Sequence, residues 1–202
     1  MIRAGTDSRG IGLASITVFD LEYTAWECSM ARHWLTPGEF KEVVQIGAVK
    51  LDANSFDVLA EFDLLVRPRI NPILSAYFEK LTGLATQTVA RQGVDFTTAY
   101  EGFLDFVEEG PIASFGRDER VLEANLRLYG LTCVRCLPVA YDLRGWFAAL
   151  GVDPRGLHSC DIGPAMGLPF AGQTHNALND ARALAGAMKA RAGRGARLRS
   201  AA

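Results

Sequence analysis

Three strand-like segments occupy the first third of the chain, and most of the remaining residues have the spacing of helices. Residues 15–21 are rich in β-branched and aromatic side chains, residues 43–51 form a second apolar run, and residues 56–66 include an alternating stretch. The turn-forming sequence Asp52-Ala-Asn-Ser55 joins the second run to the third, which predicts a hairpin. We therefore expect a mixed sheet with an antiparallel part and not a doubly wound parallel sheet.

The remainder of the chain predicts one further strand among helices. Residues 110–115 are short and apolar and are bounded by helix-breaking residues, so they form the fourth predicted strand. Apolar spacing and capping residues predict helices over residues 73–81, 86–92, 95–108, 118–129 and 141–150, in a short segment before Gly167, and over 176–192. We expect one α/β domain over residues 15–190, with a flexible leader (1–14) and a basic flexible tail (191–202).

The composition is that of an ordinary globular protein. The 202 residues include 21 Lys and Arg and 23 Asp and Glu, and a net charge of −2 is atypical of general nucleic-acid coat proteins. An enzyme that acts on nucleic acid is still compatible with this charge, because bound cations offset the carboxylates that hold them. We find no apolar run near the ~20 residues that span a bilayer and no secretory signal, so we expect a cytoplasmic protein that does not bind membranes.

The four cysteines do not predict a metal or redox site. Cys133 and Cys136 have CxxC spacing, but a structural zinc site requires four ligands and no second pair is present. The pair also follows a predicted helix instead of opening one, which disfavours a redox motif. We expect free thiols.

Two acidic residues lie two positions apart in the first strand-like segment, in the sequence Val-Phe-Asp20-Leu-Glu22. Side chains of a strand alternate between its faces, so both carboxylates point the same way. Neighbouring carboxylates repel each other unless a cation lies between them, so the pair predicts a divalent metal site. The alternative is an exposed acidic strand edge, which the strongly apolar neighbours disfavour.

Three further residues supply groups that phosphodiester hydrolysis requires. His175 and Asp180 are five positions apart, which is roughly 140° around a helix, so they would not share a helix face. We therefore expect His175 in the loop before the last helix and Asp180 in its first turns. Asp118 follows the fourth predicted strand, where it is either a helix N-cap or a carboxylate close to the first strand. An imidazole suits proton removal at neutral pH, and two divalent cations suit in-line displacement at phosphorus.

The ordered set of Asp20-x-Glu22, Asp118 followed four residues later by Leu, and His175-x4-Asp180 resembles the DEDDh (DnaQ-like) 3′–5′ exonucleases. The resemblance covers residues 16–188. It implies an RNase H-like fold in which helices flank a mixed sheet. It also implies that two Mg²⁺ or Mn²⁺ ions are held by Asp20, Glu22, Asp118 and Asp180, and that His175 is the general base.

Further segments resemble the Eri-type branch of this superfamily, which includes histone-mRNA 3′ exonucleases and bacterial KapD-like proteins. They are residues 19–26, 42–49, 66–68, 81–84 and 142–147. In this family the terminal nucleotide binds against the first strand and a helix end, which implies substrate contacts at Leu21, Tyr23, Trp26, Leu81, Thr82 and Phe115. Three arginines close in sequence to the motif acids are candidates for phosphate contacts, and solvated helix faces explain them equally well: Arg117, Arg120 and Arg182.

These expectations describe a metal-dependent 3′–5′ exonuclease that releases nucleoside 5′-monophosphates from single-stranded 3′ ends, with RNA slightly favoured over DNA. Two alternatives stay open: a DNA exonuclease of the proofreading or repair type, and a non-catalytic nucleic-acid-binding module on the same fold. The presence of all five family residues disfavours the non-catalytic module. The sequence does not reveal whether the protein has a protein partner.

Overall fold

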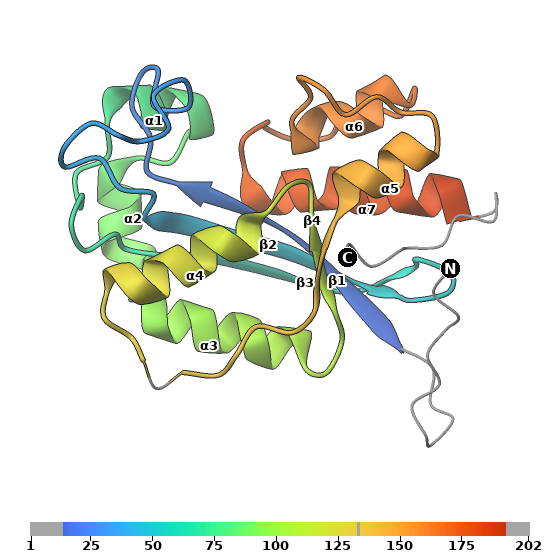
Figure 1. Ribbon diagram of the computed structural model, residues 1–202, viewed down its shortest axis with the longest axis horizontal. Coiled ribbons are helices and arrows are strands. Elements are labelled where there is room, and N and C mark those ends of the chain that lie inside the picture. The colour runs from blue at the N-terminus through green and yellow to red at the C-terminus, as the bar shows by residue number, and fades with distance from the viewer. Residues whose placement is uncertain (1–13, 133, 193–202) are drawn as a thin grey trace.

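A computed structural model describes residues 14–132 and 134–192, and Figure 1 shows how its elements are arranged. Its five-stranded sheet has the order β3-β2-β1-β4-β5. Strands β1 (Ser15–Tyr23), β2 (Val43–Asp52) and β3 (Val58–Leu65) pair antiparallel, whereas β4 (Ile112–Ser114) pairs parallel to β1 and β5 (Ala140–Asp142) parallel to β4. The sheet is therefore mixed, and the predicted hairpin is formed by β2 and β3.

The helices follow the predicted order, with ends that shift by up to three residues. They are α1 (Ala76–Thr82), α2 (Thr86–Gln92), α3 (Phe96–Val107), α4 (Asp118–Leu128), α5 (Leu143–Ala149), α6 (Ser159–Ala165) and α7 (Ala177–Ala192). The expectation that a helix begins at residue 141 is wrong, because residues 140–142 form β5. Asp142 ends this strand and caps α5 by accepting a hydrogen bond from the backbone N–H of Arg144 at 2.9 Å.

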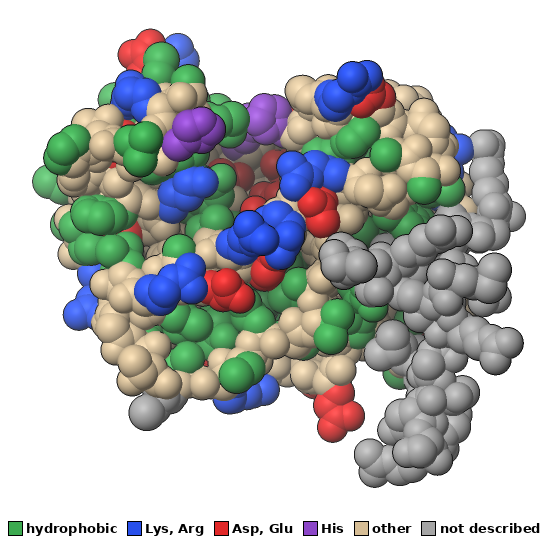
Figure 2. Space-filling view, viewed as in Figure 1, with side chains coloured by type: hydrophobic (Ala, Val, Ile, Leu, Met, Phe, Trp, Pro, Cys, Tyr) green, Lys and Arg blue, Asp and Glu red, His purple; other side chains and the backbone are tan. Residues whose placement is uncertain are grey.

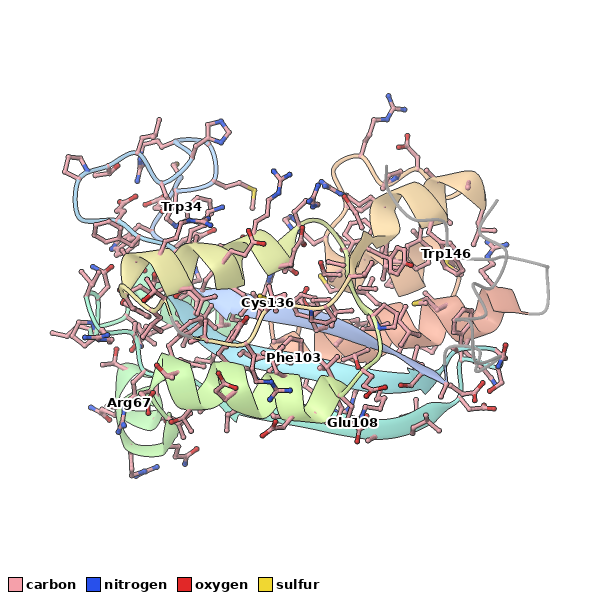
Figure 3. The ribbon with its side chains drawn as sticks, turned by 60° about the horizontal axis from the view of Figure 1, so that its bottom comes forward. Trp34, Arg67, Phe103, Glu108, Cys136 and Trp146 are labelled. Carbon is pink, nitrogen blue, oxygen red and sulfur yellow. The ribbon has the colours of Figure 1, made fainter. Side chains whose placement is uncertain are left out.

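The sheet separates two apolar layers. Because side chains alternate along a strand, Phe19 of β1 packs with α3 and α4, whereas Ile16 and Val18 pack with α5, α6 and α7. Figures 1 and 3 show α3 and α4 together on one side of the sheet. Asp20 and Glu22 continue the alternate positions of Ile16 and Val18, so their side chains emerge on the α7 side of the sheet.

A buried carboxylate fixes the segment that leads to α1. Glu42 is fully buried and accepts hydrogen bonds from the backbone N–H groups of Arg69, Ile70 and Asn71 at 2.6–2.7 Å. The hydroxyl of Tyr129 donates a fourth at 2.6 Å. Several donors on one carboxylate compensate its removal from water. The chain is thereby held where α1 forms one wall of a cavity at the edge of the sheet.

Some predictions fall on parts of the chain that the structure does not describe. Residues 1–13 of the predicted leader, residues 193–202 of the predicted tail, and Cys133 lie outside the described residues. Cys28 and Cys136 are exposed, Cys160 is buried, and all three are free thiols. No helix within residues 14–132 and 134–192 combines the length and the apolar character that crossing a bilayer requires.

Candidate active site

A cavity of about 360 Å³ opens at the sheet edge where β1, β4 and β5 end. It is lined by all five residues that the sequence singles out for chemistry: Asp20, Glu22, Asp118, His175 and Asp180. Figure 2 shows acidic side chains within a hollow of the surface and histidine side chains along its upper rim. Four carboxylates from three distant segments of the sequence therefore share one concave surface.

Strand β1 presents Asp20 and Glu22 to this cavity. Each residue is only 8% exposed, although each carries a carboxylate. They lie opposite Gly47 and Gln45 of β2, and the pairing register shifts directly after Glu22. A shift of this kind redirects side chains at the end of a strand and is common beside active sites.

The same two residues of β2 dock the beginning of α7 on the sheet. The side-chain oxygen of Gln45 accepts a hydrogen bond from the backbone N–H of Ala177 at 3.0 Å. At Gly47, a Cβ atom would lie 2.1 Å from the backbone nitrogen of Leu178. Only glycine permits such a close approach of strand and helix, so Gly47 fixes where the helix starts.

This docking brings His175 and Asp180 to the acids of β1. As predicted, His175 lies in the loop before α7, with φ of +55°, and Asp180 lies in the first turn of the helix. Asn176 caps the helix by accepting a hydrogen bond from the backbone N–H of Asn179 at 3.2 Å. One ligand atom each from Glu22, His175 and Asp180 lie within 4.8 Å of one another.

Asp118 reaches the cavity from the neighbouring strand. It is the first residue of α4, four residues after the end of β4, and it is half-buried. The N-cap position belongs to Arg117, so the alternative interpretation of Asp118 as the N-cap is wrong. Because β4 runs parallel to β1, both strands end at the same edge and deliver their acids to one place.

Burial and mutual repulsion disfavour the charged form of these acids. Burial raises the pKa of Asp20 to about 7, partly offset by the hydroxyl of Ser159, which donates a hydrogen bond to Asp20 at 2.6 Å. Burial and then the charge of Asp20 raise the pKa of Asp180 to about 8. The pKa values of Glu22 and Asp118 are also well above their usual range, first through burial and then through neighbouring charges.

The donor set fits hard divalent cations. Carboxylate oxygens predominate, which is the ligand type that Mg²⁺ and Mn²⁺ prefer. The Oδ1 atom of Asp180 is buried and has no hydrogen-bond partner within the described part of the chain. An unpaired buried oxygen is costly, and a coordinated cation satisfies it. The carboxylates that line the cavity and are available to such cations are those of Asp20, Glu22, Asp118 and Asp180.

Comparisons with known proteins point in the same direction. No protein-family model matches the chain. Human ERI1 exoribonuclease 3 is 26% identical over 171 residues, a match that covers 77% of this chain and 49% of that protein. The chain therefore spans about half the length of the curated relatives that it matches.

The solved structures decide the fold. The nuclease domain of 3′hExo, a DEDDh family member solved with bound rAMP, matches with a TM-score of 0.80, over 94% of this chain and 97% of that chain, at 20% identity. The chain has a DEDDh exonuclease fold. A 3′-exonuclease solved with a histone mRNA stem-loop matches with a TM-score of 0.76, over 93% and 85% of the two chains, at 20% identity. The predicted RNase H-like mixed sheet is thus confirmed by its likeness to the fold of these exonucleases.

The surroundings of His175 favour the neutral form of its imidazole. Burial and then the nearby His158 lower the pKa of His175 below its ordinary value of 6.5. The two imidazole rings lie nearly perpendicular, with centroids 5.7 Å apart. A neutral imidazole at the mouth of the cavity is able to accept a proton at neutral pH.

The predicted substrate contacts fall into two groups. Five of them line the cavity: Leu21, Tyr23, Trp26, Leu81 and Phe115. Thr82 does not, because its side chain is buried in α1. Its hydroxyl donates to the carbonyl of Phe78 at 2.9 Å and accepts from the backbone N–H of Leu84 at 3.1 Å. The hydroxyl of Thr82 is therefore engaged within α1 and at its end, and the predicted contact between Thr82 and a substrate stays a prediction.

The three arginines that are candidates for phosphate contacts, Arg117, Arg120 and Arg182, do not line the cavity. Arg117 forms an ion pair with Glu119, and Arg182 forms one with Glu61 of β3. The cavity is instead lined by residues to which the sequence alone assigned no role: Met30, Trp34, Tyr77, Arg144, His158 and Ser159. For Arg144 a signal was present, because it lies in the segment 142–147 that resembles the Eri-type branch.

Proposed function

We propose that the protein is a divalent-metal-dependent 3′–5′ exonuclease that removes nucleoside 5′-monophosphates from single-stranded 3′ ends, with RNA slightly preferred over DNA. The observation that carries the proposal is the convergence of four buried or half-buried carboxylates and one imidazole on a single cavity. The names of the relatives, an exoribonuclease and a 3′-exonuclease that recognises an mRNA stem-loop, support RNA as the substrate.

The chemistry assigns a role to each motif residue. Asp20, Glu22, Asp118 and Asp180 would hold two Mg²⁺ or Mn²⁺ ions, which when bound acidify water and neutralise charge on the phosphate. His175 accepts the proton of the attacking water at a ring nitrogen. The water oxygen bonds to phosphorus as the bond to the 3′-oxygen of the preceding nucleotide breaks, and that oxygen takes up a proton. The products are a nucleoside 5′-monophosphate and a shortened chain with a free 3′-hydroxyl.

The apolar part of the cavity suits the terminal nucleotide. Leu21, Tyr23 and Trp26 lie on β1 or just after it, and Leu81 reaches the cavity from α1. Stacking of a base on an aromatic ring contributes about 1–3 kcal/mol and tolerates any base. We therefore expect the enzyme to shorten chains of different sequence at similar rates.

The first test follows a 5′-labelled single-stranded oligonucleotide. With Mg²⁺ or Mn²⁺ we expect it to shorten from the 3′ end by one nucleotide at a time, and in EDTA we expect it to stay intact, because the acids need their ions. Matched RNA and DNA oligomers report the sugar preference directly. Faster digestion of DNA would assign DNA as the substrate.

Two results would contradict the proposal itself. Shortening that persists in EDTA excludes the metal-dependent mechanism, and products that shorten from the 5′ end exclude the polarity. Tight oligonucleotide binding without cleavage, even with added Mn²⁺, favours a non-catalytic binding module.

A further inference from the structure

Within the described part of the chain, one side chain with a permanent positive charge lines the cavity. Among the described residues that line it, Arg144 is the only Lys or Arg, beside four carboxylates and two histidines. Arg144 lies at the start of α5, directly after β5, whereas α1 supplies Tyr77 and Leu81 to the cavity. Figure 1 shows α1 and α5 on opposite sides of the carboxyl edge of the sheet. Basic side chains are also visible along the lower and right-hand rim of the hollow in Figure 2.

Asp142 holds the guanidinium group of Arg144, which also lies near Gly116. Asp142 accepts hydrogen bonds from Nε of Arg144 at 3.1 Å and from Nη2 at 2.7 Å. A Cβ atom on Gly116, where φ is +130°, would lie 4.0 Å from Cζ of Arg144, so the guanidinium lies beside the turn that leads to Asp118. Within the described residues Nη1 makes no hydrogen bond, and 48% of the side chain is exposed. The guanidinium group is therefore held through Nε and Nη2, and within the described residues Nη1 is available to a ligand.

We propose that Arg144 binds the substrate phosphate on the 5′ side of the scissile phosphate. The claim rests on the proposed function and extends it to a second subsite. If the terminal nucleotide lies against α1 and the scissile phosphate among the acids, the rest of the chain leaves on the α5 side, past Arg144. A guanidinium group with a free N–H edge suits a phosphate, because its donors match the spacing of two phosphate oxygens.

Arg155 is a matched control that tests whether Arg144 has only a structural role. Asp153 and Arg155 repeat the arrangement of Asp142 and Arg144: the same backbone N–H bond at 3.1 Å, Nε bonds at 3.0 Å and an Nη2 bond at 2.6 Å. Arg155 does not line the cavity, and 89% of its side chain is exposed. If Arg144 only supports its own aspartate, the two arginines are interchangeable in their effects.

RNA-binding measurements distinguish a phosphate-binding role of Arg144 from a purely structural one. We expect Arg144→Ala to weaken binding of a fluorescent single-stranded RNA about 10- to 100-fold, measured by anisotropy with Ca²⁺ in place of Mg²⁺. The slope of log affinity against log salt concentration should fall by about 0.7, because one phosphate contact to a single strand is lost. Arg155→Ala should change neither quantity. Arg144→Lys should retain most of the salt slope, since it keeps the charge, and serves as a second variant if the alanine variant folds poorly.

Comparing the turnover of two substrates tests whether Arg144 binds the phosphate on the 5′ side of the scissile phosphate. A nitrophenyl ester of a nucleoside 5′-monophosphate has no upstream phosphate. Arg144→Ala should therefore raise KM for an oligonucleotide, without lowering kcat, by a much larger factor than it changes KM for the ester. Equal losses on both substrates, or oligonucleotide binding equal to that of Arg155→Ala, would overturn the proposal. If wild-type protein binds RNA but cleaves neither substrate, the proposed function fails, and the salt slope alone decides the role of Arg144. Absence of RNA binding by wild type overturns both.

Discussion

Asp180→Asn is expected to lower exonuclease turnover by at least about 10³-fold while making the metal-free protein more stable near pH 8. Turnover falls because an amide cannot supply the charge that a divalent cation requires. Stability rises because Asp180 is 3% exposed and has an unpaired oxygen, so its carboxylate is costly to bury. Lower turnover together with higher stability would show that Asp180 serves catalysis at a cost to the stability of the fold.

The sign of the stability change follows from the pKa values. Those of Asp180 and Asp20 are raised to about 8 and about 7, well above the ordinary value of 3.8. Between about pH 4 and about pH 8 the folded chain therefore holds protons that the unfolded chain has released. Metal-free stability should fall as pH rises through this window, by up to about 1.4 kcal/mol per pH unit for each proton. Asp180→Asn removes one such group and should flatten the decline.

Urea unfolding in EDTA, at several pH values across this window, measures the effect. Asp153→Asn is the control, since Asp153 is exposed and its pKa is lowered to about 2 by hydrogen bonds from Arg155. That substitution should not stabilise the protein at any pH in the window. Full turnover by Asp180→Asn would contradict the role of Asp180 as a required metal ligand. A wild-type stability that rises from about pH 4 to about pH 8 would be incompatible with a buried acidic cluster.

Gly47→Ala is expected to destabilise the fold by at least about 3 kcal/mol. The added methyl group would lie 2.1 Å from the backbone nitrogen of Leu178, and backbone atoms cannot rotate away as a side chain does. The start of α7 must therefore shift, which also moves His175 and Asp180 away from Glu22. Urea unfolding gives the loss of stability, and turnover of any folded fraction reports the displacement.

The same substitution at Gly186 is the matched control for Gly47→Ala. Gly186 lies in α7, is exposed, and has no atom within 4 Å of the position of a Cβ. Because alanine is a better helix former than glycine, Gly186→Ala should stabilise by about 0.5–1 kcal/mol. If Gly47→Ala unfolds at the same urea concentration as wild type, α7 does not pack on β2 as described.

The sequence predicts those parts of the site that depend on local periodicity. Alternation along β1 predicts that Asp20 and Glu22 share a face, and helical geometry predicts the separate places of His175 and Asp180; the structure confirms both placements. Strand β5 is not predicted, because three residues are too few for a periodic pattern and its pairing partner in β4 is distant in sequence.

Contacts between distant elements decide which other side chains line the cavity, and the sequence does not predict these contacts. Arg182 is two residues from Asp180, yet its side chain pairs with Glu61 on the edge strand β3. Arg144 is far from every motif acid in sequence, yet parallel pairing of β4 and β5 brings it beside the turn that carries Asp118. Proximity along the chain is therefore a poor guide to the cavity, since the fold sets which side chains meet there.

The most direct measurement is an anomalous difference map from crystals grown with Mn²⁺ and a nucleoside 5′-monophosphate. We expect two peaks about 3.5–4 Å apart, each within ligand distance of carboxylates drawn from the set of Asp20, Glu22, Asp118 and Asp180. A map with no peak among these residues, or a structure in which Asp118 points away from the ion shared by the others, would contradict the proposed metal centre.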